Sequence, residues 1–79
     1  MSDISIIIAL DEKMYDCEGR VVDVEKNHFQ TRPICEVLSI NAVPAKWLTR
    51  EALIEARSQL ELSDQARYEV EYLEGHDGD

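Results

Sequence analysis

Reactive side chains are few in this sequence, and they are widely spaced. Cys17 and Cys35 form no C-x-x-C pair, and two cysteines are too few for a disulfide scaffold, so we expect reduced thiols. Together with His28 and His76 they would bind zinc only if the fold gathered them, because their spacing matches no zinc motif. The simpler interpretation makes Cys35 a core residue, Cys17 a turn residue, and both histidines solvent-facing.

Catalytic arrangements are equally weak. Cys35 and His28 can be imagined as nucleophile and base, but the sequence supplies no oxyanion hole and no cause for a lowered thiol pKa. Asp11 and Glu12 are neighbours, which on a strand point to opposite faces and make poor acid–base partners. Residues 77–79 offer carboxylate oxygens but are too short for an EF-hand loop. The sequence therefore predicts a protein that is not an enzyme and binds no metal or cofactor.

Charge is the strongest compositional feature of the chain. It has 79 residues, with 17 acids against 8 bases, for a formal net charge of −9. Residues 1–25 carry seven acids and two bases, residues 26–60 three and five, and residues 61–79 seven and one. Such a surface repels phosphates and anionic membranes and attracts basic proteins. The sequence leaves open whether the acidic ends form one face or a rim.

The acids near the C-terminal end form the best candidate binding site. Glu69, Glu71 and Glu74 flank a segment in which charged and apolar residues alternate. Carboxylates at alternate positions of a strand are spaced by roughly 6.6–7 Å, a repeat similar to that of phosphates along DNA. We therefore expect these glutamates to present charge to a basic partner, with Asp11 and Glu12 joining them. A merely solvated outer face is the alternative.

The N-terminal half predicts strands. Residues 4–10 are apolar on both faces, which favours an inner strand covered on both sides. Residues 16–19 are expected to form the hairpin turn, and residues 20–26 the returning strand. Residues 27–33 form a polar connection, and residues 34–40 are a third strand or a short helix, with the strand slightly favoured.

The C-terminal half predicts one helix and one more strand. Residues 49–60 form the helix, capped by the Thr49 hydroxyl. Residues 66–73 alternate as a half-buried strand, although a helix using Ala66, Val70 and Leu73 is the rival. Residues 75–79 are expected to be a flexible acidic tail.

These elements specify the fold class. We expect a single α+β domain over residues 1–74, with a small, mostly antiparallel sheet of about three to four strands and one main helix on one face. No segment is long enough to span a membrane, and the N-terminus lacks the basic region of a signal peptide, so a cytoplasmic protein is expected.

Trp47 and the predicted helix suggest two further roles. Trp47 is interpreted as a core or lid residue that anchors the helix, with a partner-binding role as the alternative. Arg50 and Arg57 lie in the mildly basic middle of the chain, but Glu51 and Glu55 oppose the reading of DNA, so no direct nucleic-acid binding is expected.

The leading functional hypothesis is an acidic, non-enzymatic interaction protein. Its small, acidic and motif-free profile is similar to that of phage or mobile-element proteins that inhibit nucleic-acid machinery. By this analogy in composition, we expect the chain to bind a basic protein or nucleoprotein complex by imitating nucleic acid. From their own spacing and charge, Glu69, Glu71 and Glu74 would supply the carboxylates. The alternative is a small accessory or structural subunit that forms a homodimer or complex through an apolar edge strand or Trp47.

Overall fold

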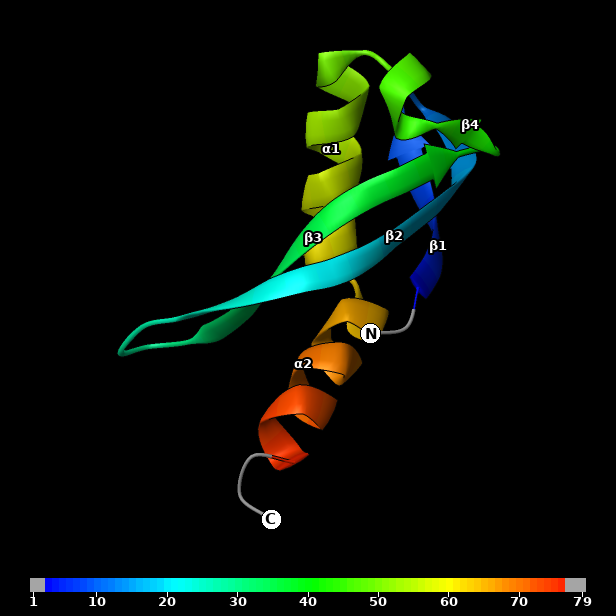
Figure 1. The fold of residues 1–79 in the computed structure, drawn as a ribbon. Coiled ribbons are helices and arrows are strands. Elements are labelled where there is room, and N and C mark those ends of the chain that lie inside the picture. The colour runs from blue at the N-terminus through cyan, green and yellow to red at the C-terminus, as the bar shows by residue number, and fades with distance from the viewer. Residues whose placement is uncertain (1–2, 77–79) are drawn as a thin grey trace.

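The structure, a computed structural model, describes the backbone of residues 3–76 and the side chains of residues 3–72. A four-stranded antiparallel sheet in the order β1-β2-β3-β4 packs two helices on one face (Figure 1). The α+β prediction is confirmed. The elements are β1 (Asp3–Leu10), β2 (Lys13–Lys26), β3 (Thr31–Ile40), β4 (Val43–Pro44), the 3-10 turn η1 (Ala45–Trp47), α1 (Arg50–Glu61) and α2 (Asp64–His76).

The first hairpin turns at Asp11 and Glu12. Both residues have positive φ, 49° and 67°, the pattern of a type I′ turn, whose twist suits a two-residue hairpin. The turn pairs Leu10 with Lys13 and so fixes the register of β1 on β2. The turn predicted over residues 16–19 was wrong, because these residues lie inside β2, opposite residues 4–7. Residues 34–40 belong to β3, so the strand alternative was correct for this segment.

The core lies between one face of the sheet and the two helices. Its members are small or branched apolar residues from β1, β2, β3, α1 and α2: Ile4, Ile8, Cys17, Val21, Cys35, Val37, Ile40, Ala56, Leu60 and Ala66. Cys35 is a core residue, as predicted, whereas Cys17 is wholly buried in β2 and does not lie in a turn. No helix of residues 3–76 lies on the other face of the sheet, so the described chain covers β1 on one side only and Ile7 is 57% exposed. The prediction of an inner strand covered on both faces was therefore wrong.

Gly19 marks the place where α1 meets the middle of the sheet. A Cβ atom built on Gly19 would overlap the Leu60 side chain and lie 2.7 Å from the Glu36 carbonyl oxygen. Leu60 is fully buried on this spot. The glycine therefore provides the close approach of helix and strand, and not the tight turn that the sequence suggested.

Helix α1 begins as predicted. Thr49 has extended backbone angles, and its hydroxyl accepts a hydrogen bond from the Ala52 N–H at 3.1 Å. That bond satisfies one of the free N–H groups in the first helical turn. The buried residues Ala56 and Leu60 are four apart, so the same face of α1 lies on the sheet over two successive turns.

Residues 66–73 belong to helix α2, and the strand prediction for them was wrong. Ser63 joins the two helices, because its hydroxyl donates to the Leu60 carbonyl oxygen and accepts from the Ala66 N–H. Ala66 and Val70, four residues apart, are buried, whereas Tyr68 is 66% exposed. Residues 75 and 76 of the expected tail lie in α2, and residues 77–79 are outside the described residues. Within the described part of the chain, neither helix has the length and apolar character needed to cross a membrane.

Candidate interaction surfaces

The predicted binding residues come from three separate places. Asp11 and Glu12 form the β1–β2 turn, Trp47 lies in η1, and Glu69 and Glu71 lie on α2. Glu74 also belongs to α2, but its side chain is outside the described residues. The fold does not align these residues in one row.

The acids of α2 do not form the predicted ladder of carboxylates. Residues two apart in a helix are rotated by about 200° around its axis, so Glu69 and Glu71 point to nearly opposite sides. Glu69 is half-buried and Glu71 is exposed. The alternating pattern that suggested a phosphate-like spacing belongs to a helix, and the spacing argument does not apply to it.

Trp47 is not a core residue. Its side chain is 73% exposed, and the Lys46 ammonium lies 5.8 Å from the centre of its ring. The distance suits a cation–π contact. Of the two interpretations of Trp47, as a core or a lid residue, the core one was wrong, and its indole is open to solvent.

An acidic groove lies beside the first two turns of α1. It has a volume of about 390 Å³ and runs between the β1–β2 turn and the helix. Three of its lining residues carry carboxylates and none carries a positive charge; the lining is Ala9, Leu10, Asp11, Thr49, Glu51, Ala52 and Glu55. The sequence marked Glu51 and Glu55 only as charges that oppose DNA binding, and not as part of a site. Their i, i+4 spacing was the available signal that both face the same way.

An arginine groove lies on the opposite flank of α1. It has a volume of about 260 Å³ and runs between the helix and β3. Its apolar floor is rimmed by Arg50 and Arg57; the lining is Cys35, Glu36, Val37, Ala45, Arg50, Leu53, Ile54 and Arg57. The sequence placed these two arginines in a mildly basic middle segment but gave no reason to expect a groove between them.

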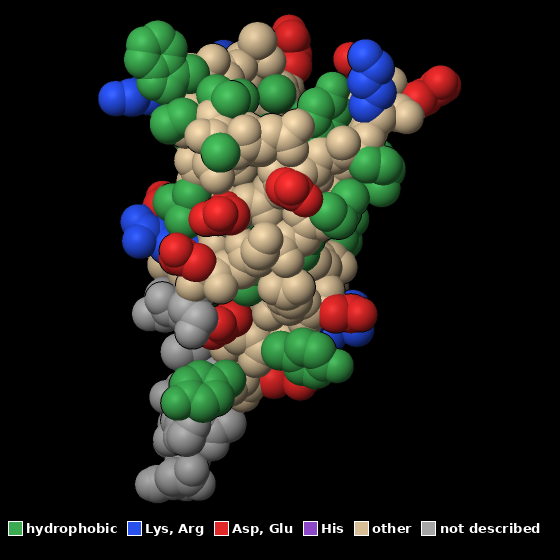
Figure 2. Space-filling view, turned by 90° about the vertical axis from the view of Figure 1, so that its right-hand side faces the viewer, with side chains coloured by type: hydrophobic (Ala, Val, Ile, Leu, Met, Phe, Trp, Pro, Cys, Tyr) green, Lys and Arg blue, Asp and Glu red, His purple; other side chains and the backbone are tan. Residues whose placement is uncertain are grey.

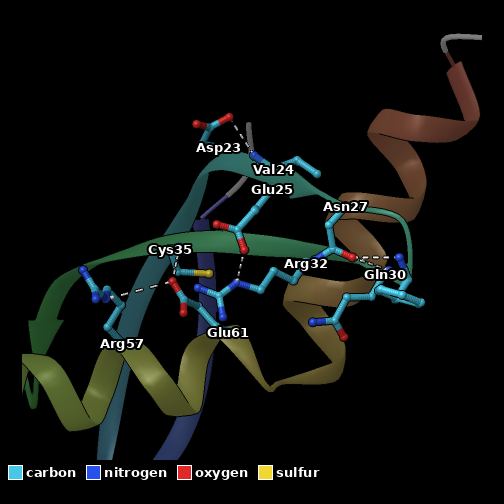
Figure 3. Close-up of polar contacts among 10 residues, drawn as sticks. Asp23, Val24, Glu25, Asn27, Gln30, Arg32, Cys35, Arg57 and Glu61 are labelled. Atoms are coloured by element: carbon cyan, nitrogen blue, oxygen red, sulfur yellow. Dashed lines mark hydrogen bonds and ion pairs between the residues drawn. The ribbon is translucent and has the colours of Figure 1, made fainter.

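Three consecutive residues of α1 hold the helix to three consecutive strands. The Gln59 amide donates to the Ala9 carbonyl oxygen of β1 at 2.7 Å and accepts from the Ala9 N–H at 2.9 Å. Leu60 packs on Gly19 of β2. The Glu61 carboxylate accepts from the Cys35 N–H of β3 at 2.8 Å (Figure 3). These contacts fix the position of both grooves relative to the sheet.

Ion pairs neutralise only part of the acidic charge. Among the described residues Arg20 pairs with Glu36 at 2.7 Å and Arg32 with Glu25 at 3.1 Å. Arg57 lies 4.0 Å from Glu61 on the arginine flank. The three carboxylates of the acidic groove form no ion pair with any described residue.

The acidic side chains do not all gather on one face. In Figure 2 they are spaced apart among apolar and uncharged groups over the side that it shows. The acidic groove is therefore a local cluster within a more dispersed distribution of charge. A binding role for the carboxylates depends on this cluster and not on the total charge.

The two thiols are protected inside the fold. Burial raises the pKa of the Cys35 thiol to about 11, and the nearby Glu61 charge adds to the shift. Burial also raises the pKa of Cys17, with a smaller contribution from Glu18. Both stay protonated at neutral pH, the form that is a poor nucleophile. Exposed His28 lies at the β2–β3 loop, where its ring meets Phe29 edge-on, and the described residues contain no cluster of three or more metal-ligating side chains.

No protein-family model, curated protein or solved structure matches this chain.

Proposed function

We propose that this chain is a non-enzymatic interaction protein that binds a basic protein through the acidic groove. The observation that carries the proposal is the grouping of Asp11, Glu51 and Glu55 around one cavity whose lining contains no lysine or arginine. Unpaired carboxylates of this kind attract a basic surface from solution and select against acidic ones. Glu12 extends the same charge at the adjacent turn position.

The partner class follows from the charge and the size of the site. A cavity of about 390 Å³ accepts one or two basic side chains, but not a folded domain, so the rest of the contact would form around its rim. Exposed Trp47 supplies an aromatic side chain of the type that is common at interface anchors. A nucleic-acid-binding protein is one such basic partner, and we propose it as the target class. Both described cysteines are free, which fits a reducing cytoplasm.

The turn offers a test that keeps the fold intact. In the double variant Asp11→Asn, Glu12→Gly two carboxylates are removed, and the dipeptide created is the one that type I′ turns prefer. The matched control is Glu69→Gln, Glu71→Gln, which removes the same charge from α2. Binding of a fluorescent octalysine peptide is measured by anisotropy, from low salt to about 0.3 M ionic strength.

We expect the turn variant to bind about tenfold more weakly than the native chain at low salt, and the α2 variant to differ by less than about threefold. Affinity of the native chain should fall steeply as salt is added, because exposed charges are screened. Equal losses in both variants would mean that net charge alone attracts the peptide, which contradicts a localised site.

Self-association is a second candidate, favoured by the uncovered face of the sheet. Ile7 and Met14 lie on this face on adjacent strands, and they are 57% and 67% exposed. Large exposed apolar side chains on a free sheet face are typical of an interface. Light scattering at rising concentration tests it: a dimer that Ile7→Lys abolishes and Trp47→Ala preserves supports this face, and a monomer throughout rejects it.

A further inference from the structure

The arginine groove lies beside the part of β3 that the short strand β4 leaves uncovered. β4 pairs with β3 only at Ser39 and Ile40, and the chain then leaves the sheet at η1. Figure 1 shows β3 continuing well beyond the short β4, and no other described strand pairs with its outer side. The uncovered part of β3 borders the groove, since Cys35 and Val37 form one of its walls.

The backbone N–H and C=O groups on the outer edge of β3 are only partly hydrogen-bonded. Successive residues of a strand turn their N–H and C=O groups to opposite sides. The Cys35 N–H points away from β2, because it donates to Glu61 of α1. Val37, two residues further on, therefore turns its N–H and C=O to the same side. No turn, loop or side-chain group among the described residues bonds to them.

The opposite wall of the groove supplies apolar contacts and positive charge. Leu53 and Ile54 face the cavity, and Ile54 is 52% exposed. Arg50 and Arg57 are seven residues apart, which places them on the same side of α1, about 10 Å apart along its axis. Arg50 has no ion pair with any described residue. The carboxylate of Glu36, which also lines the groove, is paired with Arg20.

We propose that the arginine groove binds an extended segment of a partner protein, which adds to the edge of β3 and carries carboxylates on either side of an aliphatic residue. The backbone of the segment would bond to Val37, its aliphatic side chain would pack on Leu53 and Ile54, and its carboxylates would meet Arg50 and Arg57. Carboxylates four residues apart on a strand are separated by about 13 Å, close to the separation of the two arginines. At this edge the Cys35 N–H already donates to a carboxylate, that of Glu61.

The surface is distinct from the acidic groove and selects the opposite charge, so it does not depend on the proposed function. Its occupant is acidic and extended, whereas the acidic groove is proposed to bind basic side chains. A failure of octalysine binding therefore leaves this inference unaffected.

The test uses the full chain labelled with nitrogen-15 and three synthetic peptides. The first is acetyl-Glu-Ser-Val-Ser-Glu-amide, in which Glu, Val and Glu share one face of a strand. The second replaces both glutamates by lysine, and the third keeps the glutamates but has an N-methylated valine. Binding is followed by amide shifts and by hydrogen exchange of the Val37 amide.

We expect the acidic peptide to shift the amides along Cys35–Val37 and to slow exchange at Val37 about tenfold when the peptide is nine times its Kd. The lysine peptide and the N-methylated peptide should bind at least about tenfold more weakly. Equal binding of the lysine peptide, an unprotected Val37 amide, or no binding of the acidic peptide at millimolar concentration would overturn the proposal.

Arg50→Glu is the decisive variant, because it reverses the charge without threatening the helix. Arg50 is the first residue of α1, where an acidic side chain suits the helix dipole better than a basic one. We expect about tenfold weaker binding of the acidic peptide. The control Arg67→Glu makes the same change on α2, outside this groove, and should leave the affinity within about twofold. Equal losses in both variants would overturn the groove as the site.

Discussion

Helix α1 covers the two edges of the sheet in different ways. On the β1 edge Gln59 bonds to both backbone groups of Ala9, and Gln65 of the following helix α2 does the same for Ser5. On the β3 edge Glu61 accepts from the Cys35 N–H but has no hydrogen to donate to a backbone carbonyl oxygen. A side-chain amide has a donor and an acceptor and can stand in for a missing strand, whereas a carboxylate only accepts. One edge is thereby closed against pairing, and the other stays half-open.

The two flanks also differ in charge. The β1 flank has three unpaired carboxylates around its groove, and the β3 flank has two arginines around its own. Both flanks belong to one helix, whose neighbouring residues 50 and 51 fall into different grooves. A net charge of −9 therefore does not describe what a partner meets at either surface. The edge chemistry of the sheet and the charge pattern of the helix together give the two flanks opposite charge and differently closed edges.

The largest loss of stability should come from disturbing the contact between Gly19 and Leu60, which lies between the two flanks. Gly19→Ala places a methyl group against Leu60 and 2.7 Å from the Glu36 carbonyl oxygen. We expect a loss of about 3 kcal/mol in the free energy of unfolding, measured in urea, because the helix must move off the sheet. In a Leu60→Ala background the same change should cost less, since part of the overlap is gone. A cost that is equal in both backgrounds contradicts Leu60 as the contact.

Exchanging the two edge caps tests the comparison directly. Gln59→Glu puts a carboxylate where the Ala9 carbonyl oxygen needs a donor, and should cost about 1–2 kcal/mol of unfolding free energy. Glu61→Gln keeps an acceptor for the Cys35 N–H and should cost less than about 1 kcal/mol. Urea unfolding of both variants at neutral pH provides the measurement. Equal costs would show that the two edges are closed by the same kind of contact.

The Cys35 thiol makes the stability of the β3 flank depend on pH. Its pKa is about 11 in the folded chain against an ordinary value of 9.0, first through burial and then through Glu61. The unfolded chain loses this proton first, so the contribution is complete below pH 9 and is lost as pH rises toward 11. We expect a loss of about 2 kcal/mol relative to Cys35→Ala across that range. Glu61→Gln should reduce this loss. If the free energy of unfolding falls as steeply with pH in Cys35→Ala as in the native chain, the thiol is not its cause.

The smallest expected effect is an increase in the free energy of unfolding. Arg50 places a positive charge in the first turn of α1, where the helix dipole disfavours it. Arg50→Glu should raise the free energy of unfolding by about 0.3–1 kcal/mol, measured by urea or thermal unfolding at low salt, and the gain should shrink as salt is added. A loss of stability instead would show that Arg50 makes a favourable contact within the chain.

Local patterns predicted correctly those elements in which residue type and hydrophobic period indicate the same structure. Residues 4–10 and 34–40 are rich in β-branched side chains, and Thr49 precedes an apolar stripe of helical period, so these strands and α1 were correct. Residues 66–73 fit both a period of two and a helix through Ala66 and Val70. The segment packs on the sheet as α2 and buries both Ala66 and Val70, so the helical period was the correct one.

The hairpin turn failed for a different reason. Asp11 and Glu12 adopt left-handed backbone angles that few non-glycine residues favour, so neither suggests a type I′ turn as strongly as glycine would. Gly19 suggested a turn but serves the contact with Leu60. Of the candidate site, the sequence identified Asp11, but not its grouping with Glu51 and Glu55, because this depends on where α1 lies over the sheet.

By itself, the sequence determined the fold class, the excess of carboxylates, the position of α1 and the cap at Thr49, since each follows from composition or from contacts within a few residues. Only the tertiary structure decided which acids and arginines share a groove and which backbone groups at the sheet edges find a partner. Those properties arise between residues tens of positions apart, and the docking of Gln59, Leu60 and Glu61 on three strands brings them together.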